Sequence, residues 1–199
     1  MNSLSFNIDR FIFTTKSQEL DLSFIPANTR RRLNSFDKHV LYMLNHCIEE
    51  TVENIVLSSQ YGEFERLISL IEQYNEFNEV SPMIFSASVH NYPLGQFSLL
   101  KQKTFPTISV SAGTDSFISG LITAITEPQK NVVYCYADNT EQENFGICFN
   151  IKNNNPKNYI LRNTNLKHTE FSLKETINLF NGKTNSIQIQ NFNIERVLS

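Results

Sequence analysis

Short apolar runs that alternate with amphipathic stretches are the feature that most constrains how this chain can fold. The runs at residues 55–57, 107–110 and 132–137 are rich in β-branched or aromatic residues, which is typical of buried strands. A further run at 145–151 follows a polar segment, 138–144, that can join two strands as a hairpin. This order predicts a layered α/β domain with a mostly parallel sheet.

Apolar residues at helical spacing fill the segments between these runs. Pro26 and the apolar positions from 33 to 52, which recur at steps of three and four, predict one long helix with a buried stripe. The same spacing predicts helices over 64–77 and 114–126. Residues 82–100 are expected to form a turn that leads into a helix broken near Pro93 and Gly95. These helices are expected to cover the faces of the sheet.

The two ends of the chain carry fewer signals. The first 25 residues alternate apolar and polar residues near their start, which predicts a short extended piece. Ser172 and Glu175 have the spacing of a capping box, so a helix is expected to begin there and to end at Gly182. Residues 187–192 are expected to form a last strand.

The composition is that of an ordinary globular chain and excludes several classes of function. With 199 residues, 40% of them hydrophobic and 19% charged, the chain suits a single domain over residues 1–199. A net charge of -3 argues against broad binding to nucleic acid, which needs a basic face. The sequence has neither a signal peptide nor an apolar run of membrane-spanning length, so a cytoplasmic protein is expected.

Cysteine spacing and known motifs give no sign of a cofactor. Cys47, Cys135 and Cys148 are far apart in the sequence, so neither a disulfide framework nor a metal site is predicted. Cys135 and Cys148 fall inside apolar strands, where a free cysteine is usually a small buried hydrophobe. The sequence also lacks a glycine-rich phosphate loop and a paired-histidine zinc motif. We therefore expect no cofactor and no metal.

The basic cluster Arg30-Arg31-Arg32 has two open interpretations. The first is the solvated start of the helix predicted after it. The second is an ionic contact with a protein or with a carrier that bears phosphopantetheine. A nucleic-acid patch would need further basic residues with aromatic ones between them, so no nucleic-acid partner is predicted.

A polar turn between the strand at 107–110 and the helix after it is the best candidate for a reactive site. Residues 111–116 read Ser-Ala-Gly-Thr-Asp-Ser. Enzymes place nucleophiles at turns of this kind because the helix N-terminus stabilises an anion. Taken alone, however, the turn is better explained as a helix start with polar caps.

Several short motifs surround this turn in a fixed order. The stretch from Ser81 to Asn91 precedes Gly95 and then Ala112-Gly113. Further pieces follow the same order: Arg30 to Leu33, Ser58 to Glu63, Gly113 to Phe117, and Gly120-Leu121. The set covers roughly residues 25 to 152 and resembles the N-terminal domain of β-ketoacyl synthases. More closely, it resembles the short ketosynthase-like proteins of aryl polyene pathways.

The resemblance implies a subunit without catalytic activity. In active members the residue at the elbow is a cysteine that accepts the acyl chain, and that position matches Gly113, which cannot form a thioester. The catalytic histidines of the family lie in a C-terminal half for which this chain has no counterpart. Ser116 lies one helical turn inside, where a serine usually bonds a backbone carbonyl and does not act as a nucleophile.

The resemblance also implies an architecture and a partner. The fold should be half of the thiolase-like architecture: a mostly parallel, five-stranded mixed sheet with helices on its faces. A lone half would leave a large apolar face bare, and such a face usually has a partner. We therefore expect a hetero-oligomer with a full-length β-ketoacyl synthase, in which this chain acts like a chain-length factor. An acyl carrier protein is a second expected partner.

Two sets of residues follow from the resemblance. The subunit contact is expected at Thr107, Ile108, Ser109, Val110, Ser111, His90 and Asn91. Ile84, Ser88 and Val89 are expected to line the end of the partner's acyl pocket, or else only to pack the interface. His90 is expected to be a hydrogen-bonded structural histidine.

Two other classes of function remain open. One is a stand-alone enzyme that acts on acyl thioesters through an unusual nucleophile. The other is a scaffold that binds carrier protein without contacting a ketosynthase. Covalent labelling by an acyl-carrier substrate would favour the enzyme, and co-purification would separate the scaffold from the ketosynthase subunit.

Overall fold

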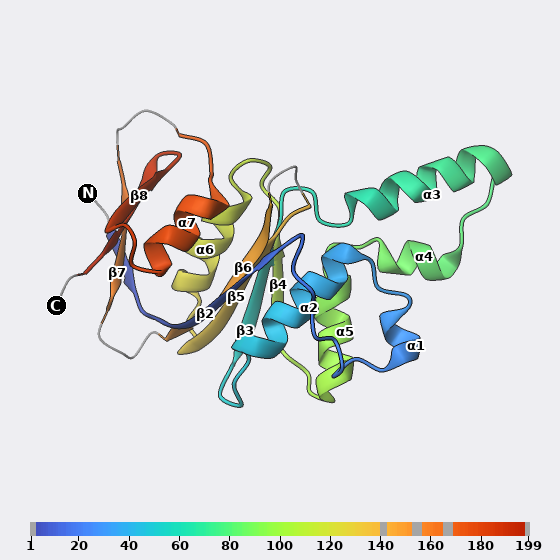
Figure 1. Ribbon diagram of the computed structural model, residues 1–199, viewed down its shortest axis with the longest axis horizontal. Helices are drawn as coiled ribbons and strands as arrows, with labels where there is room; N and C mark the ends of the chain where they lie inside the picture. The colour runs from blue at the N-terminus through green and yellow to red at the C-terminus, as the bar shows by residue number, and fades with distance from the viewer. Residues whose placement is uncertain (1–2, 140–142, 153–156, 165–168, 198–199) are drawn as a thin grey trace.

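The computed structural model describes residues 3–139, 143–152, 157–164 and 169–197. Figure 1 shows these residues as stacked layers of sheets and helices, with a helical arm that projects from one end. A four-stranded sheet, a layer of two helices, a five-stranded sheet and a second helical layer follow one another. The α/β fold class predicted from the sequence is confirmed.

The larger sheet is mixed. Its strands lie in the order β2 (Ile8–Thr15), β6 (Asn144–Lys152), β5 (Asn131–Ala137), β3 (Asn54–Ser58) and β4 (Thr107–Val110). β3 pairs parallel with β4 and β5, whereas β6 pairs antiparallel with β5 and β2. The sheet is therefore less parallel than expected, because the predicted hairpin and an N-terminal strand supply two antiparallel pairings.

Helices cover both faces of this sheet. On one face, α2 (Ser35–Cys47) and α5 (Tyr92–Lys101) pack against the buried side chains of β3, β5 and β6. On the other face lie α6 (Ser116–Thr126) and α7 (Leu173–Phe180). α6 approaches β3 closely, since a Cβ on Gly120 would lie only 2.6 Å from Ser58. The hydroxyl of Tyr134 donates to the carbonyl of Phe117 at 2.6 Å and so fixes the first turn of α6.

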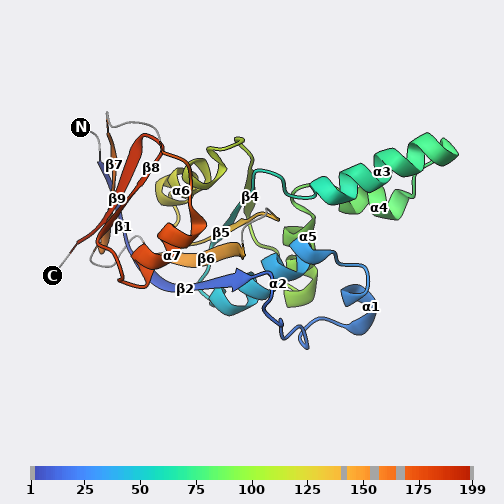
Figure 2. The same ribbon diagram turned by 45° about the horizontal axis from the view of Figure 1, so that its top comes forward.

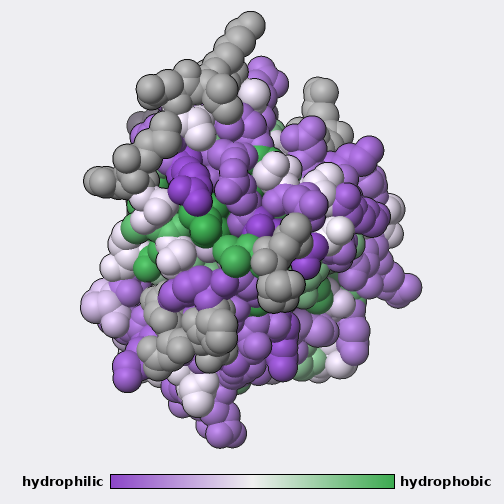
Figure 3. All heavy atoms as spheres, turned by 90° about the vertical axis from the view of Figure 1, so that its left-hand side faces the viewer, coloured by the Kyte–Doolittle hydropathy of each residue, from purple (hydrophilic) through white to green (hydrophobic). Residues whose placement is uncertain are grey.

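A second, antiparallel sheet covers the far side of α6 and α7. Its strands lie in the order β1 (Ser3–Phe6), β7 (Tyr159–Asn163), β9 (Phe192–Arg196) and β8 (Ser186–Ile189). Leu161 and Ile194 on its inner face belong to the same buried cluster as Phe117 and Leu121 of α6. Figure 3 shows that the side of the molecule formed by this sheet is mostly hydrophilic.

This second sheet corrects one expectation. We expected a lone half of a thiolase-like fold to leave a large apolar face bare, but here the chain covers that face of α6 and α7 with its own strands. The last strand predicted near 187–192 overlaps β8 and the start of β9, and the extended piece predicted near the N-terminus overlaps β1, whereas β7 was not predicted. All four strands are short, and β1, β7 and β9 each bury only one or two apolar side chains, which gives little pattern to read.

The long helix expected from Pro26 to Val52 is two helices. α1 (Ala27–Arg30) ends before Asn34, whose side chain caps α2 by accepting from the Asp37 amide at 2.8 Å. The Asp37 carboxylate accepts in return from the Asn34 amide at 3.2 Å. This capping box starts a new helix where apolar spacing alone indicated continuity.

The projecting arm consists of α3 (Phe64–Phe77) and α4 (Pro82–Ala87), which lie side by side in Figures 1 and 2. The predicted helix over 64–77 is confirmed, but its apolar stripe is not buried, because only Leu70 has a buried side chain. The exposed residues are Phe64, Leu67, Ile68, Ile71, Tyr74 and Phe77. The helix break predicted near Pro93 and Gly95 is wrong in position: it falls at residues 88–91, between α4 and α5, and Pro93 lies in the first turn of α5, where proline is tolerated.

Candidate functional site

The turn between β4 and α6 has the shape of a nucleophile elbow. Gly113 lies at its tip with φ +59°, in the left-handed region that favours glycine. Residues 111–115 are all exposed. A Cβ added to Gly113 would meet no other atom within 4 Å, so a side chain here would project into open space. The backbone thus presents this position outward, at the junction of strand and helix where elbows hold a nucleophile.

Internal hydrogen bonds hold the elbow in shape. The Ser116 hydroxyl is buried, donates to the Gly113 carbonyl at 2.7 Å and accepts from the Ala112 amide at 2.9 Å. Gln190, in the turn between β8 and β9, donates to the Thr114 carbonyl at 2.8 Å. Ser116 therefore has the structural role predicted for it, since its hydroxyl is used within the turn.

A hollow of about 170 Å³ lies beside the elbow and brings together three of the residues singled out in the sequence. Ser88, His90 and Ser111 all line it, together with Ser59. The Nε2 atom of His90 lies 2.6 Å from the Ser59 Oγ atom. Burial lowers the pKa of His90, and the charge of Asp138 opposes this shift only in part. His90 is therefore neutral at pH 7.

The loop at the floor of this hollow is bound to a carboxylate. Asp138 accepts from the amides of Gln60 and Tyr61, both at 2.8 Å, and from the Gly62 amide at 3.4 Å. These amides would otherwise be candidate donors for an oxyanion. Because they are already paired with a negative charge, the loop is poorly suited to stabilise one.

β4 forms an open edge of the larger sheet, as the predicted subunit contact requires. Among the described strands it pairs only with β3. Ile108 and Val110 pack partly against the core, whereas Thr107 and Ser109 are exposed, so the side chains alternate between the two faces of the sheet. The carbonyls of Pro106 and Val110 accept from β3, so the N–H of Ser109 points to the open edge.

The structure separates the residues predicted for the acyl pocket. Ser88 lines the hollow beside the elbow, and its hydroxyl donates to the Phe85 carbonyl at 2.8 Å. Ile84 instead lines a second hollow, of about 450 Å³, between α4 and the turn that joins α1 to α2. Val89 is 47% exposed, and Asn91 is exposed at the start of α5. Ile84 and Ser88 therefore do not share one pocket.

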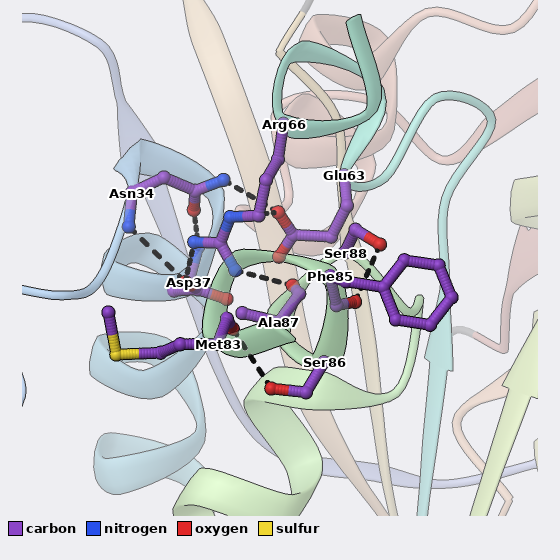
Figure 4. Close-up of polar contacts among 9 residues, drawn as sticks. All are labelled: Asn34, Asp37, Glu63, Arg66, Met83, Phe85, Ser86, Ala87 and Ser88. Atoms are coloured by element: carbon purple, nitrogen blue, oxygen red, sulfur yellow. Dashed lines mark hydrogen bonds and ion pairs between the residues drawn. The ribbon is translucent and has the colours of Figure 1, made fainter. Parts of the chain in front are cut away.

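A buried polar cluster joins the arm to the rest of the molecule (Figure 4). Arg66 of α3 lies between two acidic side chains: Asp37, which it contacts at 2.7 Å, and Glu63, which it contacts at 3.5 Å. It also donates to the Ala87 carbonyl at the end of α4. Asn34 donates to the Glu63 carboxylate at 2.7 Å. One arginine thus connects α2, α3 and α4.

The surroundings of Glu63 in this cluster raise the pKa of its carboxyl group. Burial raises the pKa of the Glu63 carboxyl to about 8, the nearby Asp37 adds to the shift, and Arg66 opposes it. One oxygen of each carboxylate has no hydrogen-bond partner among the described residues. Apolar spacing alone did not predict this cluster, although Asp37 and Arg66 are charged residues within apolar helical stripes and could have indicated it.

The described residues offer no other reactive centre of the common kinds. Cys47, Cys135 and Cys148 are buried free thiols, and the latter two lie in strands as predicted. Within the described ranges, no group of three or more His, Cys, Asp and Glu residues could hold a metal ion. In this part of the chain, no helix has both the length and the apolar character needed to cross a membrane.

Comparison with known families identifies the class to which this fold and elbow belong. Residues 8–161 match the family described as the N-terminal domain of β-ketoacyl synthase. The chain is therefore a member of the β-ketoacyl synthase N-terminal domain family, as its motifs predicted. No curated protein matches the sequence.

Several solved structures share the fold, among them the following two. One is the ketosynthase ApeO in complex with its chain length factor ApeC from Xenorhabdus doucetiae, with a TM-score of 0.76 and 19% identity. That match covers 97% of this chain and 100% of the other. The other is the ishigamide ketosynthase/chain length factor, with a TM-score of 0.58 and 11% identity over 75% of this chain. This chain covers 54% of the second chain, about half its length.

Proposed function

We propose that this chain is a non-catalytic, chain-length-factor-like subunit that binds and stabilises an active β-ketoacyl synthase. The observation that carries the proposal is Gly113 at the tip of the elbow. The turn, its left-handed backbone and the open space around it are present, but there is no side chain to accept an acyl group. Decarboxylative condensation needs a nucleophile and a base together, so the partner must supply both.

The arm and the edge of β4 support the proposed partnership. Exposed apolar residues of this size on a projecting helix are unusual unless another chain covers them. The open edge of β4 offers backbone groups that no described strand pairs, as a second surface for a partner. Both structural relatives are named as ketosynthases with chain length factors, and fatty acid or aryl polyene-type biosynthesis is the setting we propose. The whole of residues 1–199 would act as one domain in the cytoplasm.

The test is co-expression with a ketosynthase encoded near this chain, followed by sizing of the purified complex. We expect a hetero-oligomer. When a carrier protein loaded with an acyl group is added, mass spectrometry should find the thioester on the ketosynthase and not on this chain. A stoichiometric thioester on Cys47, Cys135 or Cys148 would contradict the proposal, since all three are buried.

A chain-length role would act through Ser88. This side chain lines the hollow beside the elbow, whereas Ile84 lies in the separate hollow on the other side of α4. In an intact complex, Ser88→Phe should fill that space and shorten the products without abolishing condensation. Ile84→Ala serves as the matched control and should leave product length unchanged. Products of unaltered length from an intact Ser88→Phe complex would limit this chain to stabilising its partner.

One observation favours an acyl-thioester enzyme as the second candidate. Ser59 Oγ and His90 Nε2 lie 2.6 Å apart with a neutral imidazole, which is the geometry of a nucleophile and its base. Against this, the Ser59 residue is only 1% exposed, and the amides next to it are bound to Asp138. Hydrolysis of acyl thioesters by the isolated chain, lost in Ser59→Ala, would favour this candidate over the first.

A further inference from the structure

The place of Ser88 depends on a series of buried polar contacts that runs from α2 through Arg66 to the end of α4 (Figure 4). We infer that Arg66 is a positioning residue, which fixes the end of α4 and thereby sets where Ser88 lies in the hollow beside the elbow. This positioning concerns the chain by itself. Its consequence, that Arg66 helps to set the length of the product, rests on the proposed function.

Apolar packing does little to hold α4 in place. Ala87 is the only one of its six residues with a buried side chain. Hydrogen bonds instead attach each end of the helix to α3. At the start of α4, the Ser81 amide donates to the Gln73 side-chain oxygen at 3.2 Å. At its end, Arg66 donates to the Ala87 carbonyl. The chain continues from there into Ser88, so the place of Ser88 depends on this second bond.

Ser88 lies between two fixed points of the chain. Ala87, on one side, is held by Arg66. His90, on the other side, is held by Ser59, whose Oγ atom lies 2.6 Å from the His90 Nε2 atom. Ser59, Ser88 and His90 all line the hollow beside the elbow. A shift of either fixed point therefore changes the shape of the wall of this hollow.

Arg66 can fix the end of α4 because two buried carboxylates determine its own place. Its Nη2 atom lies 2.7 Å from Asp37 and its Nε atom lies 3.5 Å from Glu63, and both acidic side chains are buried. Asp37 in turn belongs to the capping box at the start of α2. The third nitrogen, Nη1, is the one that donates to Ala87. A lysine carries the same charge on a single nitrogen, which cannot occupy all three places.

The same contacts lie between the two hollows on either side of α4. Glu63 lines the hollow beside the elbow, whereas Arg66 and Ala87 line the hollow of about 450 Å³. The ion pair between Glu63 and Arg66 is thus part of the wall that separates the two spaces. Loosening this wall should alter the hollow that contains Ser88.

Thiol labelling of the isolated chain tests the positioning without a ketosynthase. Ser88→Cys places a reporter in the wall of the hollow, and Gly113→Cys places a second one at the elbow, which Arg66 does not contact. Since Ser88 is partly buried, alkylation there by iodoacetamide requires the end of α4 to move. Arg66→Lys should raise the rate at position 88 about tenfold, the factor for one lost hydrogen bond to a charged group, and leave position 113 unchanged.

Two further variants make the test specific to the Arg66 contacts. Gln73→Ala is the matched control, because it removes the hydrogen bond at the other end of α4 and should leave position 88 unchanged. Asp37→Asn keeps the shape of the capping side chain but removes a charge that holds Arg66, so it should raise the rate at position 88 by a smaller factor. This milder variant gives the answer if Arg66→Lys does not fold.

The outcomes separate the positioning from the proposed function. Unchanged labelling at position 88 in Arg66→Lys and Asp37→Asn would overturn the inference, and so would an equal rise at position 113. In an intact complex with the ketosynthase, Arg66→Lys should change the length of the products without abolishing condensation. Faster labelling at position 88 with unaltered products would leave Arg66 as a positioning residue and remove the chain-length role. Altered products without faster labelling would overturn the inference and leave that role standing.

Discussion

The two ends of the molecule treat apolar surface in opposite ways. At one end, the four-stranded sheet covers α6 and α7, so the side chains of Leu161 and Ile194 are buried and the outer side is hydrophilic. At the other end, α3 buries only Leu70 and exposes a row of large apolar residues. The buried apolar side chains that stabilise the fold therefore lie at the covered end, whereas the arm leaves its large apolar side chains exposed.

The largest expected contrast lies between two isoleucines, one at each end. Ile194 is fully buried between the second sheet and α6, so Ile194→Ala should lower the free energy of unfolding by about 2–5 kcal/mol. Ile71 is 48% exposed on the arm, so Ile71→Ala should change it by less than about 0.5 kcal/mol. Urea denaturation measures both variants.

For binding to a partner, the substitution on the arm should have the larger effect, the reverse of the order expected for stability. Ile71→Ala should weaken the binding of this chain to its proposed ketosynthase partner, because about half of that side chain is exposed in the isolated chain. A stable chain with undiminished association after Ile71→Ala would show that the arm is not a docking surface. Equal destabilisation by both substitutions would show that the arm is part of the core.

The polar cluster at the base of the arm, where the arm joins the rest of the molecule, should make the free energy of unfolding depend on pH. The pKa of Glu63 rises from its ordinary value of 4.5 to about 8 on folding, so the folded chain binds that proton more tightly. The stabilisation is complete below pH 4.5 and is lost as the pH rises through 8, with a slope of at most about 1.4 kcal/mol per pH unit.

Glu63→Gln is the matched control for this pH dependence, because it keeps the shape of the protonated acid. Its unfolding free energy should change less between pH 4.5 and 8 than that of the wild type. Hydrogen exchange of α3 amides tests whether the arm opens first. An identical pH profile in both proteins would mean that Glu63 is ionised throughout.

What the sequence predicted well was local. The strands at 107–110 and 132–137 and the helices at 64–77 and 114–126 all formed, because each depends on spacing within a few residues. The break at Asn34 was missed, since it is produced by a capping hydrogen bond from Asp37 and not by a change in apolar spacing.

Spacing could not tell which apolar stripe would be covered. The helices at 64–77 and 114–126 have similar patterns in sequence, yet one is exposed and the other is buried between two sheets. The difference comes from β1, β7, β8 and β9, short strands from both ends of the chain that meet only in the folded protein. At the elbow, the sequence predicted the turn, and the structure added the hydrogen bonds of Ser116 and Gln190 that hold it.

Gly113 and Gly120 give a smaller contrast, between the cost in stability of adding a side chain at an open position and at a buried one. Gly113→Cys meets open space, so its cost should be limited to the left-handed backbone, about 1–2 kcal/mol. Gly120→Cys would push a Cβ to within 2.7 Å of Tyr134 and should destabilise the chain more. In the native state, iodoacetamide should alkylate the new thiol at position 113 and leave the three buried cysteines unmodified. Slow alkylation at position 113 would show that the elbow is covered.

The smallest effect is expected at the open edge of β4, where two prolines separate association from folding. Ser109→Pro removes an N–H that points away from β3, so the ladder within the chain stays intact. If the partner pairs with this edge, each hydrogen bond lost should weaken the complex by about 0.5–1.5 kcal/mol, while urea denaturation of the isolated chain changes little. Ile108→Pro is the control, because its N–H points toward β3 and its loss should destabilise the fold itself. If both variants lose the same stability, the Ser109 N–H is used within the fold and β4 is not an open edge. If Ser109→Pro leaves association unchanged, the partner does not pair with β4, and the arm alone remains as the proposed docking surface.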